Sequence, residues 1–544
     1  MITTVYYILG IFGQNTFSID SLTEVNEILQ TAKDEFAWVT NSTLLRACIL
    51  DDNPLTFQLE MNTNEKIEII QAFKPWRTNG WRFLIEDRDE LFSSDYCEMN
   101  AYVTQEGRSW QIKLATKHAW DAYFKFAYGK DTLLPKSKKG VDDYGGIAMT
   151  AIDSLDTLWM IGLYKEFEQA VDMIKETKYK DNFVNLFETT IRALGGFLST
   201  YTLTNKSFFL DRAFDLGKRL QPALKTQFPT SDINLMNGNL KNAWNHMNSL
   251  SEMVLTIEFK YLSELTNDKT FSSDINRIDE LIHEYAKNNN YLLNIFLDPQ
   301  IGKFQGPITL GARGDSYYEY LLKEYVRSNN SIYGNNFINS MESIFKFLID
   351  DDYFVHELIN GKKNAKMDHL VCFLPGSIGL AVKEKLLSYD YISVAQKLMK
   401  TCLKMYDTET GVAPEITKKN STNHLYIDIN DKHNLLRPEV LESLYIMYMV
   451  TCDSFYQEWS WEIFKNIEYY ARIVDESFIL YGGISNVSSL IPNHLDTMPS
   501  YFISESLKYA FLTATSFNVL DTYVLNTEGH LFSRIPSNYS LQCF

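Results

Sequence analysis

The chain has 544 residues, of which 45% are hydrophobic and 22% charged, so it can form one large globular domain or several ordinary ones. Its formal net charge of -18 at pH 7 argues against a nucleic-acid-binding surface, because phosphate neutralisation needs clustered Lys and Arg. The six cysteines form no CxxC pair, which argues against a zinc site built from thiolates.

The N-terminal region, residues 1–100, has no motif that indicates a role. Its apolar stretch Val5–Phe12 is too short to span a bilayer, and the basic segment of a clear signal peptide is missing. Membrane association through this region is left open but is not evident. Six N-x-S/T sequons permit a secretory location without showing it: Asn41, Asn205, Asn329, Asn420, Asn486 and Asn538.

Residues 101–544 show a repeated helical pattern. In each unit a polar or acidic cluster opens an apolar helix, a short turn follows, and an aromatic residue begins a second helix. Apolar residues recur at i, i+3, i+4 and i+7, which predicts helices rather than strands. The units cover residues 188–224, 258–286, 315–349, 375–406 and 438–472, and a last one begins at 504.

A period of roughly 60 to 70 residues fits either an open helical solenoid or a closed toroid of paired inner and outer helices. Charged residues gather at the start of each first helix, whereas the second helices are ordinary amphipathic surface helices. If the first helices form an inner ring, these acids converge at one end of it. This convergence favours an all-α toroid.

The segment Leu435–Met449 illustrates the chemistry of these helix starts. Glu439 and Glu442 are one turn apart on one helix face, and buried acids are costly unless they are paired or metal-bound. Glycoside hydrolysis uses a protonated acid and a second carboxylate, and arginines help to keep neighbouring acids ionised. An arginine accompanies three of the acids: Arg192 with Glu188, Arg313 with Asp315, and Arg437 with Glu439.

Nine segments in sequence order resemble class I α-1,2-mannosidases, glycoside hydrolase family 47. They extend from His118 to His530, about three-quarters of the chain. The segments are HAWDAYFKFAYGKDTLLP, IDSLDTLWMIGL, FETTIRALGGFLSTY, LGARGDSYYEYLLK, MDHLVCFLPG, GVAPEI, KHNLLRPEVLESL, ISESLKYAF and YVLNTEGH.

The resemblance implies an (α/α)7 barrel of paired inner and outer helices, closed at one end, with a Ca²⁺ ion at the bottom of the pocket. It also implies inverting hydrolysis of α-1,2-linked mannose from high-mannose N-glycans on glycoproteins. Such an enzyme would trim Man9GlcNAc2 to Man8GlcNAc2 in the lumen of the endoplasmic reticulum, in glycoprotein processing and quality control.

The same resemblance implies roles for individual residues. Glu188 corresponds to the general acid, acting through a water, and Glu439 to the general base. Asp315 is the third catalytic carboxylate, whose role in the family is argued both ways. Thr527 corresponds to the direct protein ligand of Ca²⁺, through its hydroxyl and carbonyl oxygens. A site with few protein ligands suits Ca²⁺, which accepts six to eight oxygens, including waters and sugar hydroxyls.

Further residues are implied to surround the metal and the sugar. Tyr501 stands where the family usually has a phenylalanine that stacks on the mannose. The acids expected to hold the metal's waters are Glu442, Glu505, Glu258 and Glu528. The residues expected to contact substrate are Arg192, Arg313, Arg437, Tyr501, Glu258 and Glu505.

Arg313 resembles the endoplasmic-reticulum branch of the family, in which an arginine here favours removal of a single mannose. Cys372 and Cys402 match the family's disulfide pair, which requires an oxidising compartment. The other four cysteines are expected to be free or buried: Cys48, Cys97, Cys452 and Cys543.

Three alternatives remain at this point. One is a glycan-binding degradation factor of the same family with weak hydrolysis, although such proteins diverge around GARGDSYYEY and the disulfide pair. A second is a Golgi-type enzyme that removes several mannoses. A third is a helical-repeat scaffold, which would not explain the arginines beside the acids.

Overall fold

The computed structural model describes four strands between residues 44 and 87, then residues 105–242, 247–475 and 478–535, with side chains from residue 107 onward. The chain divides into two compact units. The first contains Met1–Gln111 and Glu462–Tyr470, and the second contains Ile112–Trp461 and Ala471–Phe544.

The first unit contains a four-stranded antiparallel sheet of order β1-β2-β3-β4. Its strands are β1 (Leu44–Ile49), β2 (Thr56–Thr63), β3 (Lys66–Phe73) and β4 (Arg82–Asp87). The all-α prediction is therefore wrong for this region. The strand signal was present, since Ile67, Glu68 and Ile69 alternate apolar and polar residues and only two residues separate β2 from β3.

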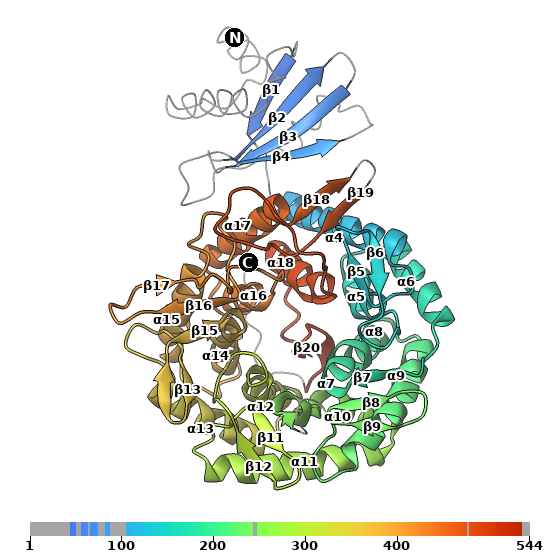
Figure 1. The fold of residues 1–544 in the computed structure, drawn as a ribbon, viewed down its shortest axis with the longest axis vertical. Coiled ribbons are helices and arrows are strands. Elements are labelled where there is room, and N and C mark those ends of the chain that lie inside the picture. Colours follow the sequence, from blue (N-terminus) through green and yellow to red (C-terminus); the bar gives the residue numbers. More distant parts are fainter. Residues whose placement is uncertain are drawn as a thin grey trace. The chain divides into compact units, whose positions relative to one another are not determined.

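The second unit is rich in helices, as predicted, and its inner helices form a closed ring (Figure 1). Each inner helix contacts the next one along the chain, and the segment leading into α18 contacts α5. An open solenoid does not fit this closure. The inner helices are α5 (Met149–Met160), α8 (Gly195–Thr204), α10 (Thr256–Thr266), α12 (Asp315–Ser328), α14 (Leu374–Lys383), α16 (Glu439–Thr451) and α18 (Lys508–Thr515).

A second layer of helices packs outside the ring, each helix against the inner helix that precedes it in the chain. These are α6 (Tyr164–Glu176), α9 (Ser207–Leu220), α11 (Lys269–Asn288), α13 (Ser331–Phe347) and α15 (Tyr391–Lys404). Two further long helices, α4 (Gln105–Phe126) and α17 (Ser454–Tyr470), precede α5 and follow α16 in the chain. The inner helix α16 is buried from Val440 to Val450, whereas α9 and α11 are amphipathic.

Three of the turns between inner and outer helices begin with an asparagine. Asn205, Asn267 and Asn329 follow α8, α10 and α12 in the left-handed conformation, with φ of 53°, 58° and 55°. Asparagine tolerates this conformation better than most residues, so it ends the inner helix sharply. Asp268 and Asn330 then cap the next outer helices through their side chains.

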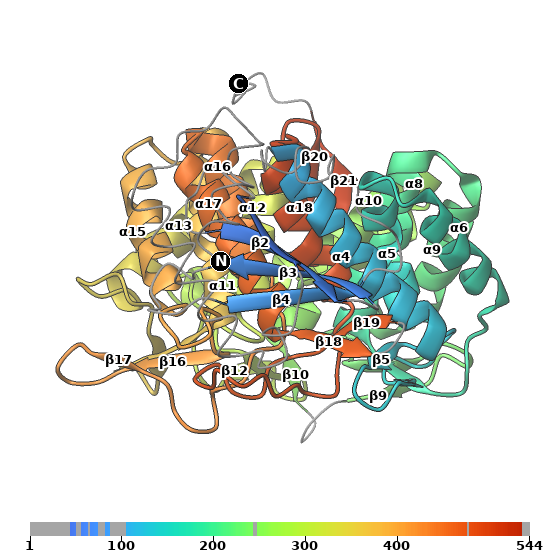
Figure 2. The same ribbon diagram turned by 90° about the horizontal axis from the view of Figure 1, so that it is seen from above.

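The short strands of this unit gather at one end of the ring, and the β20–β21 hairpin lies at the other (Figure 2). β20 (Tyr523–Leu525) contacts α12 and β21 (Leu531–Ser533) contacts α8, so the hairpin occupies the interior of the ring. The other strands are β5 (Thr132–Leu134), β6 (Lys139–Val141), β7 (Phe183–Asn185), β8 (Asp232–Asn234), β9 (Leu240–Lys241), β10 (Asn248–Ser249), β11 (Phe296–Asp298), β12 (Lys303–Gln305), β13 (Glu357–Ile359), β14 (Lys362–Asn364), β15 (Lys366–Asp368), β16 (Ile416–Lys419), β17 (Leu425–Tyr426), β18 (Arg472–Asp475) and β19 (Phe478–Tyr481).

The predicted disulfide between Cys372 and Cys402 is confirmed. It joins the 3₁₀ helix η6 (His369–Phe373) to α15. Cys452 is also disulfide-bonded, so the expectation that it is free or merely buried is wrong. The side chain of Cys48 and the residues Cys97 and Cys543 lie outside the described residues.

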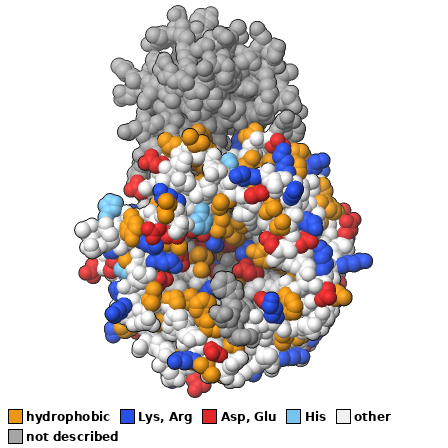
Figure 3. Space-filling view, viewed as in Figure 1, with side chains coloured by type: hydrophobic (Ala, Val, Ile, Leu, Met, Phe, Trp, Pro, Cys, Tyr) orange, Lys and Arg blue, Asp and Glu red, His pale blue; other side chains and the backbone are white. Residues whose placement is uncertain are grey.

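Lys and Arg side chains are interspersed with Asp and Glu over the visible face of the helical unit (Figure 3). Within the part of the chain that the structure describes, no helix combines the length and the apolar character needed to cross a bilayer.

Candidate active site

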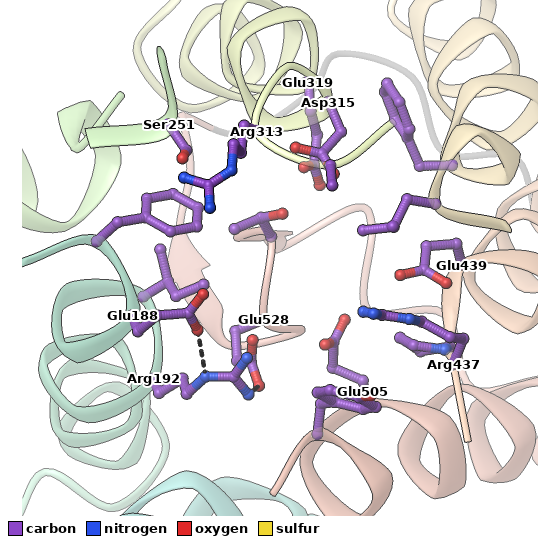
Figure 4. Close-up of a pocket in the computed structure, with 18 of the residues that line it drawn as sticks. Glu188, Arg192, Ser251, Arg313, Asp315, Glu319, Arg437, Glu439, Glu505 and Glu528 are labelled. Carbon is purple, nitrogen blue, oxygen red and sulfur yellow. Dashed lines mark hydrogen bonds and ion pairs between the residues drawn. The ribbon is translucent and has the colours of Figure 1, made fainter. Parts of the chain in front are cut away.

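The starts of the inner helices surround a cavity of about 460 Å³ (Figure 4). Among the described residues, eight acids and three arginines line it. Asp315 and Glu439 are the first residues of α12 and α16, where the helix dipole favours a negative charge. The acids are Glu188, Glu252, Asp315, Glu319, Glu439, Glu442, Glu505 and Glu528, and the arginines are Arg192, Arg313 and Arg437.

Glu188 ends the short helix α7 (Leu186–Glu188), which continues directly as the π-helix η2 (Thr189–Leu194). The side chain of Asn185 accepts a hydrogen bond from the Glu188 backbone N–H at 2.9 Å. Arg192 Nε donates to Glu188 Oε2 at 2.8 Å, as Figure 4 shows. The carboxylate of Glu188 is thus held on one side while about a third of the side chain (34%) remains exposed to the cavity.

The guanidinium of Arg192 also joins two other parts of the site. It donates to Ser500 Oγ at 3.1 Å and to Glu528 Oε1. Tyr501 lies between two guanidinium groups, with its ring centroid 5.4 Å from Arg192 Cζ and 5.5 Å from Arg437 Cζ. Its hydroxyl donates to the Leu435 carbonyl at 2.8 Å, so the ring predicted to stack on mannose has a fixed orientation.

Asp315 is half-buried at the start of α12, on the cavity wall opposite Arg192 in Figure 4. Burial raises the pKa of this carboxyl well above its ordinary value, and the charges of Glu319 and Glu439 add to the effect. Arg313, two residues earlier, has a left-handed φ of 72°. Its guanidinium points toward Ser251 on the same side of the cavity (Figure 4).

Glu439 lies on the opposite side of the cavity from Glu188 (Figure 4). His369 Nδ1 is 2.8 Å from Glu439 Oε2, and His369 Nε2 is 2.9 Å from the Tyr406 hydroxyl. Burial opposes ionisation of Glu439, but the hydrogen bond from His369 and the charge of Arg437 lower its pKa below the ordinary value. Glu439 is therefore an ionised carboxylate at neutral pH.

Thr527 lies at the turn of the β20–β21 hairpin and lines the cavity. The preceding residue, Asn526, fixes this turn because its Oδ1 accepts from the N–H groups of Glu528 and His530 at 3.0 and 2.9 Å. Gly529 has φ of 70°, and an added Cβ would approach the Ser504 carbonyl to 3.1 Å. A glycine suits this close approach.

The turn is also held from beneath by a fully buried charge network. His530 Nδ1 is 2.9 Å from Asp156 Oδ2, and His530 Nε2 is 3.0 Å from Asp153 Oδ1. Lys508 Nζ donates to Asp156 Oδ1 at 3.0 Å and to the Gly529 carbonyl at 2.6 Å. The oxygens of Thr527 are thus presented by a rigid base.

Three predicted water-holding acids line the cavity with Thr527, namely Glu442, Glu505 and Glu528. Burial raises the pKa of Glu442 to about 7, with repulsion from Glu319 adding to the shift and Lys323 opposing it. Burial and neighbouring carboxylates also raise the pKa of Glu505 and of Glu528 well above the ordinary value. Such mutual repulsion is relieved by a cation.

Glu258 is placed differently from its prediction. It does not line the cavity but is fully buried, where its Oε1 accepts from Tyr320 Oη at 2.6 Å and from Asn526 Nδ2 at 2.7 Å. The expected substrate contact is therefore corrected to a contact that supports the turn of Thr527. Its other oxygen, Oε2, is buried without a hydrogen-bond partner among the described residues.

A calcium ion fits the donors around Thr527. Hydroxyl, carbonyl and carboxylate oxygens are the hard donors that Ca²⁺ prefers, and an unpartnered buried oxygen of Glu258 lies under the same turn. In the described part of the chain, no three His, Cys, Asp or Glu side chains are arranged to bind a metal directly. The donor set therefore fits an ion that contacts the protein through Thr527 and reaches the acids through water.

Several polar residues of the site were not singled out from the sequence, among them Glu252, Glu319, Lys323 and His369. Glu319 lines the cavity one turn after Asp315, and Lys323 lies one turn further along α12. His369 belongs to the quoted segment MDHLVCFLPG but has no local pattern that marks it. The spacing of Asp315 and Glu319 on one helix face was the available signal for Glu319.

Residues 115–534 match the profile described as Glycosyl hydrolase family 47. The chain belongs to this family. It is 40% identical over 438 residues to the endoplasmic reticulum mannosyl-oligosaccharide 1,2-alpha-mannosidases of Mus musculus and Homo sapiens, and the match covers 76% of this chain. The match covers 66% and 62% of those two relatives, so the chain spans slightly less than two-thirds of their length.

Other members of family 47 are matched over more of their length. The endoplasmic reticulum mannosyl-oligosaccharide 1,2-alpha-mannosidase of Schizosaccharomyces pombe is 34% identical over 471 residues, covering 79% of this chain and 90% of that protein. Among solved structures, the alpha-1,2-mannosidase from Trichoderma reesei superposes with a TM-score of 0.72 at 25% identity. That match covers 79% of this chain and 99% of the solved chain, so the family fold is present in this protein.

Proposed function

We propose that this family 47 protein is an inverting α-1,2-mannosidase that removes terminal α-1,2-linked mannose from high-mannose N-glycans. The observation that carries the proposal is the placement of Glu188 and Glu439 on opposite sides of one cavity that Thr527 also lines. An inverting glycosidase needs an acid on one side of the glycosidic bond and a base-activated water on the other. The names of the relatives support the substrate class.

The protein's own residues perform the proton transfers in this mechanism. Glu439, kept ionised by His369 and Arg437, takes a proton from the attacking water. Glu188 delivers a proton to the leaving oxygen through a water, and Arg192 orients its carboxylate. The protonated form favoured at Asp315 makes this carboxyl a second source of that proton.

Calcium is the proposed cofactor. Thr527 would hold it through its hydroxyl and carbonyl oxygens, and Glu442, Glu505 and Glu528 would hold its waters. When bound, the ion would supply a positive charge that attracts the hydroxyl oxygens of the terminal mannose. Arg313, Arg437 and Tyr501 bind and orient the rest of the substrate from the cavity wall.

The remaining features of the proposal concern architecture and location. The closed ring with its outer layer supports an (α/α)7 barrel for the helical unit. The disulfide between Cys372 and Cys402 supports an oxidising compartment, and the names of the relatives indicate the endoplasmic reticulum. Removal of a single mannose, Man9GlcNAc2 to Man8GlcNAc2, is the reaction that Arg313 favours.

The test is incubation of the purified full chain with Man9GlcNAc2, with calcium or with excess chelator. We expect loss of one hexose by mass spectrometry, release of β-mannose by early NMR spectra, and loss of activity in chelator that added calcium restores. Release of several hexoses would support Golgi-type trimming instead. Glycan binding without any product would contradict the enzyme assignment.

A further inference from the structure

Lys323 is a buried cation directly beneath the cavity, and the proposed reaction gives it no role. It lies on α12 in register with Asp315 and Glu319, at intervals of four residues, so all three project from one helix face. Only 2% of the residue is exposed, and it does not line the cavity. A lysine is rarely buried this deeply unless every donor is satisfied.

The ammonium group of Lys323 has a protein partner for each of its three protons. It donates to Glu319 Oε1 on its own helix, to Glu442 Oε1 on α16 at 3.0 Å, and to the Asn526 carbonyl at 3.1 Å. Glu319 and Glu442 both line the cavity, and Asn526 immediately precedes Thr527. One side chain thus joins two cavity acids from different helices to the turn that carries Thr527.

We infer that Lys323 is a positioning residue for the calcium site. It fixes the orientation of the Glu319 and Glu442 carboxylates and the position of the turn that carries Thr527. The inference rests on the proposed calcium site and extends it to a residue that touches neither the ion nor the sugar. Residues that orient the groups around a metal commonly change its affinity by about 10- to 100-fold when they are replaced.

Lys323 has two opposite effects on the affinity for a bound cation, so the direction in which the affinity changes tests the inference. As a nearby positive charge, Lys323 repels the ion, so its removal would tighten calcium binding. As an anchor, it holds the two carboxylates and the Asn526 carbonyl, so its removal would weaken binding. The anchor effect should dominate, because Lys323→Met removes the donor of Glu319 Oε1 and leaves Glu442 Oε1 and the Asn526 carbonyl with only their longer hydrogen bonds, from Tyr509 at 3.4 Å and from the Gly529 N–H at 3.2 Å.

The experiment measures the calcium Kd by titration calorimetry, and the melting temperature with calcium and with chelator, on the full chain. For Lys323→Met we expect a Kd about 10- to 100-fold higher than wild type and a smaller calcium-dependent rise in melting temperature. Lys323→Gln, which keeps one donor group and perturbs folding less, should give a smaller change in the same direction.

Lys260 provides the matched control. It is a mostly buried lysine on α10 whose Nζ lies 3.1 Å from Asp279 Oδ2 and contacts the Tyr333 hydroxyl, and neither partner lines the cavity. Lys260→Met should lower the melting temperature equally with and without calcium and leave the calcium Kd unchanged.

An unchanged or lower calcium Kd in folded Lys323→Met and Lys323→Gln would overturn the positioning role. Equal losses of calcium affinity in the Lys323 and Lys260 variants would overturn it as well, because they would reflect general destabilisation. A wild-type protein that shows no calcium response would instead overturn the calcium site on which this inference rests.

Discussion

His369 Nδ1 lies 2.8 Å from Glu439 Oε2, although 70 residues separate the two in the sequence. The other ring nitrogen is 2.9 Å from the Tyr406 hydroxyl, so the imidazole is held at both ends. The half-buried carboxylate of Glu439 thereby has a donor on the side away from the cavity. This leaves its second oxygen available to a water.

The first prediction follows from the pKa of Glu439. Burial would raise this pKa, but His369 and Arg437 lower it, so the base is active down to acidic pH. In His369→Phe the pKa of Glu439 should rise, and the acidic limb of the kcat/KM profile should move to higher pH. Tyr406→Phe, which keeps the histidine, should shift the limb less. An acidic limb that stays in place in His369→Phe would show that His369 does not influence the base.

The second prediction concerns the acid and the base. Glu188→Gln and Glu439→Gln should each reduce kcat by roughly 10²- to 10⁴-fold, because each removes one proton transfer while keeping side-chain size. α-Mannosyl fluoride, whose leaving group needs no proton, should restore turnover in Glu188→Gln but not in Glu439→Gln. Restoration in Asp315→Asn instead of Glu188→Gln would transfer the acid role to Asp315.

The third prediction concerns metal binding at the β20–β21 turn. Thr527→Ala removes the hydroxyl ligand and should weaken calcium binding, lowering activity and the calcium-dependent rise in melting temperature together. Thr527→Ser keeps the hydroxyl and should retain most of both. A melting temperature of the wild type that ignores a strong chelator would contradict a structural calcium.

The fourth prediction concerns branch choice. The guanidinium of Arg313 points into the cavity toward Ser251, where its fixed set of donors can bind several sugar hydroxyls (Figure 4). Arg313→Leu should keep the chemistry but continue past the first mannose, so mass spectrometry should detect products that lack three or four hexoses. If the variant is slower yet still stops after one mannose, Arg313 serves only to balance the charge of Asp315.

The fifth prediction concerns the disulfide. The 30-residue separation of Cys372 and Cys402 corresponds to a stabilisation of about 3–4 kcal/mol in the chain-entropy model. Cys372 lies three residues after His369 on η6, so the bridge also supports the wall behind Glu439. Replacing both cysteines by serine should lower the melting temperature in non-reducing buffer, and the difference from wild type should shrink in reducing buffer, which opens the same disulfide in the wild type.

Local motifs singled out four residues that the structure places together. Glu188, Asp315, Glu439 and Thr527 each belong to a short recognisable segment, and the structure brings all four to one cavity. The helical periodicity predicted the helices of the second unit, because apolar inner helices and amphipathic outer helices differ in pattern. These helices and motifs could be predicted because each depends on residues that are close together in the sequence.

The rest depended on contacts between distant segments. Lys323 and Glu442 are 119 residues apart, and neither local sequence reveals the pair. Glu258 opens its helix like the other acids, yet Tyr320 and Asn526 hold it below the cavity. The strands between Leu44 and Asp87 were missed because short alternating runs gave a weaker signal than the helical motifs downstream.

Two π-helical segments among the described residues limit which single-residue deletions the inner ring can tolerate. η2 (Thr189–Leu194) carries Arg192, and η7 (Phe502–Leu507) carries Glu505, and each runs straight into a regular inner helix. A π segment takes up one extra residue, and one residue corresponds to about 100° of rotation around a helix. Deleting a single residue such as Ala193 would therefore restore an ordinary helix but rotate its two halves against each other. The half that faces the cavity and the half that packs against neighbouring helices can keep their separate alignments only while the extra residue is present.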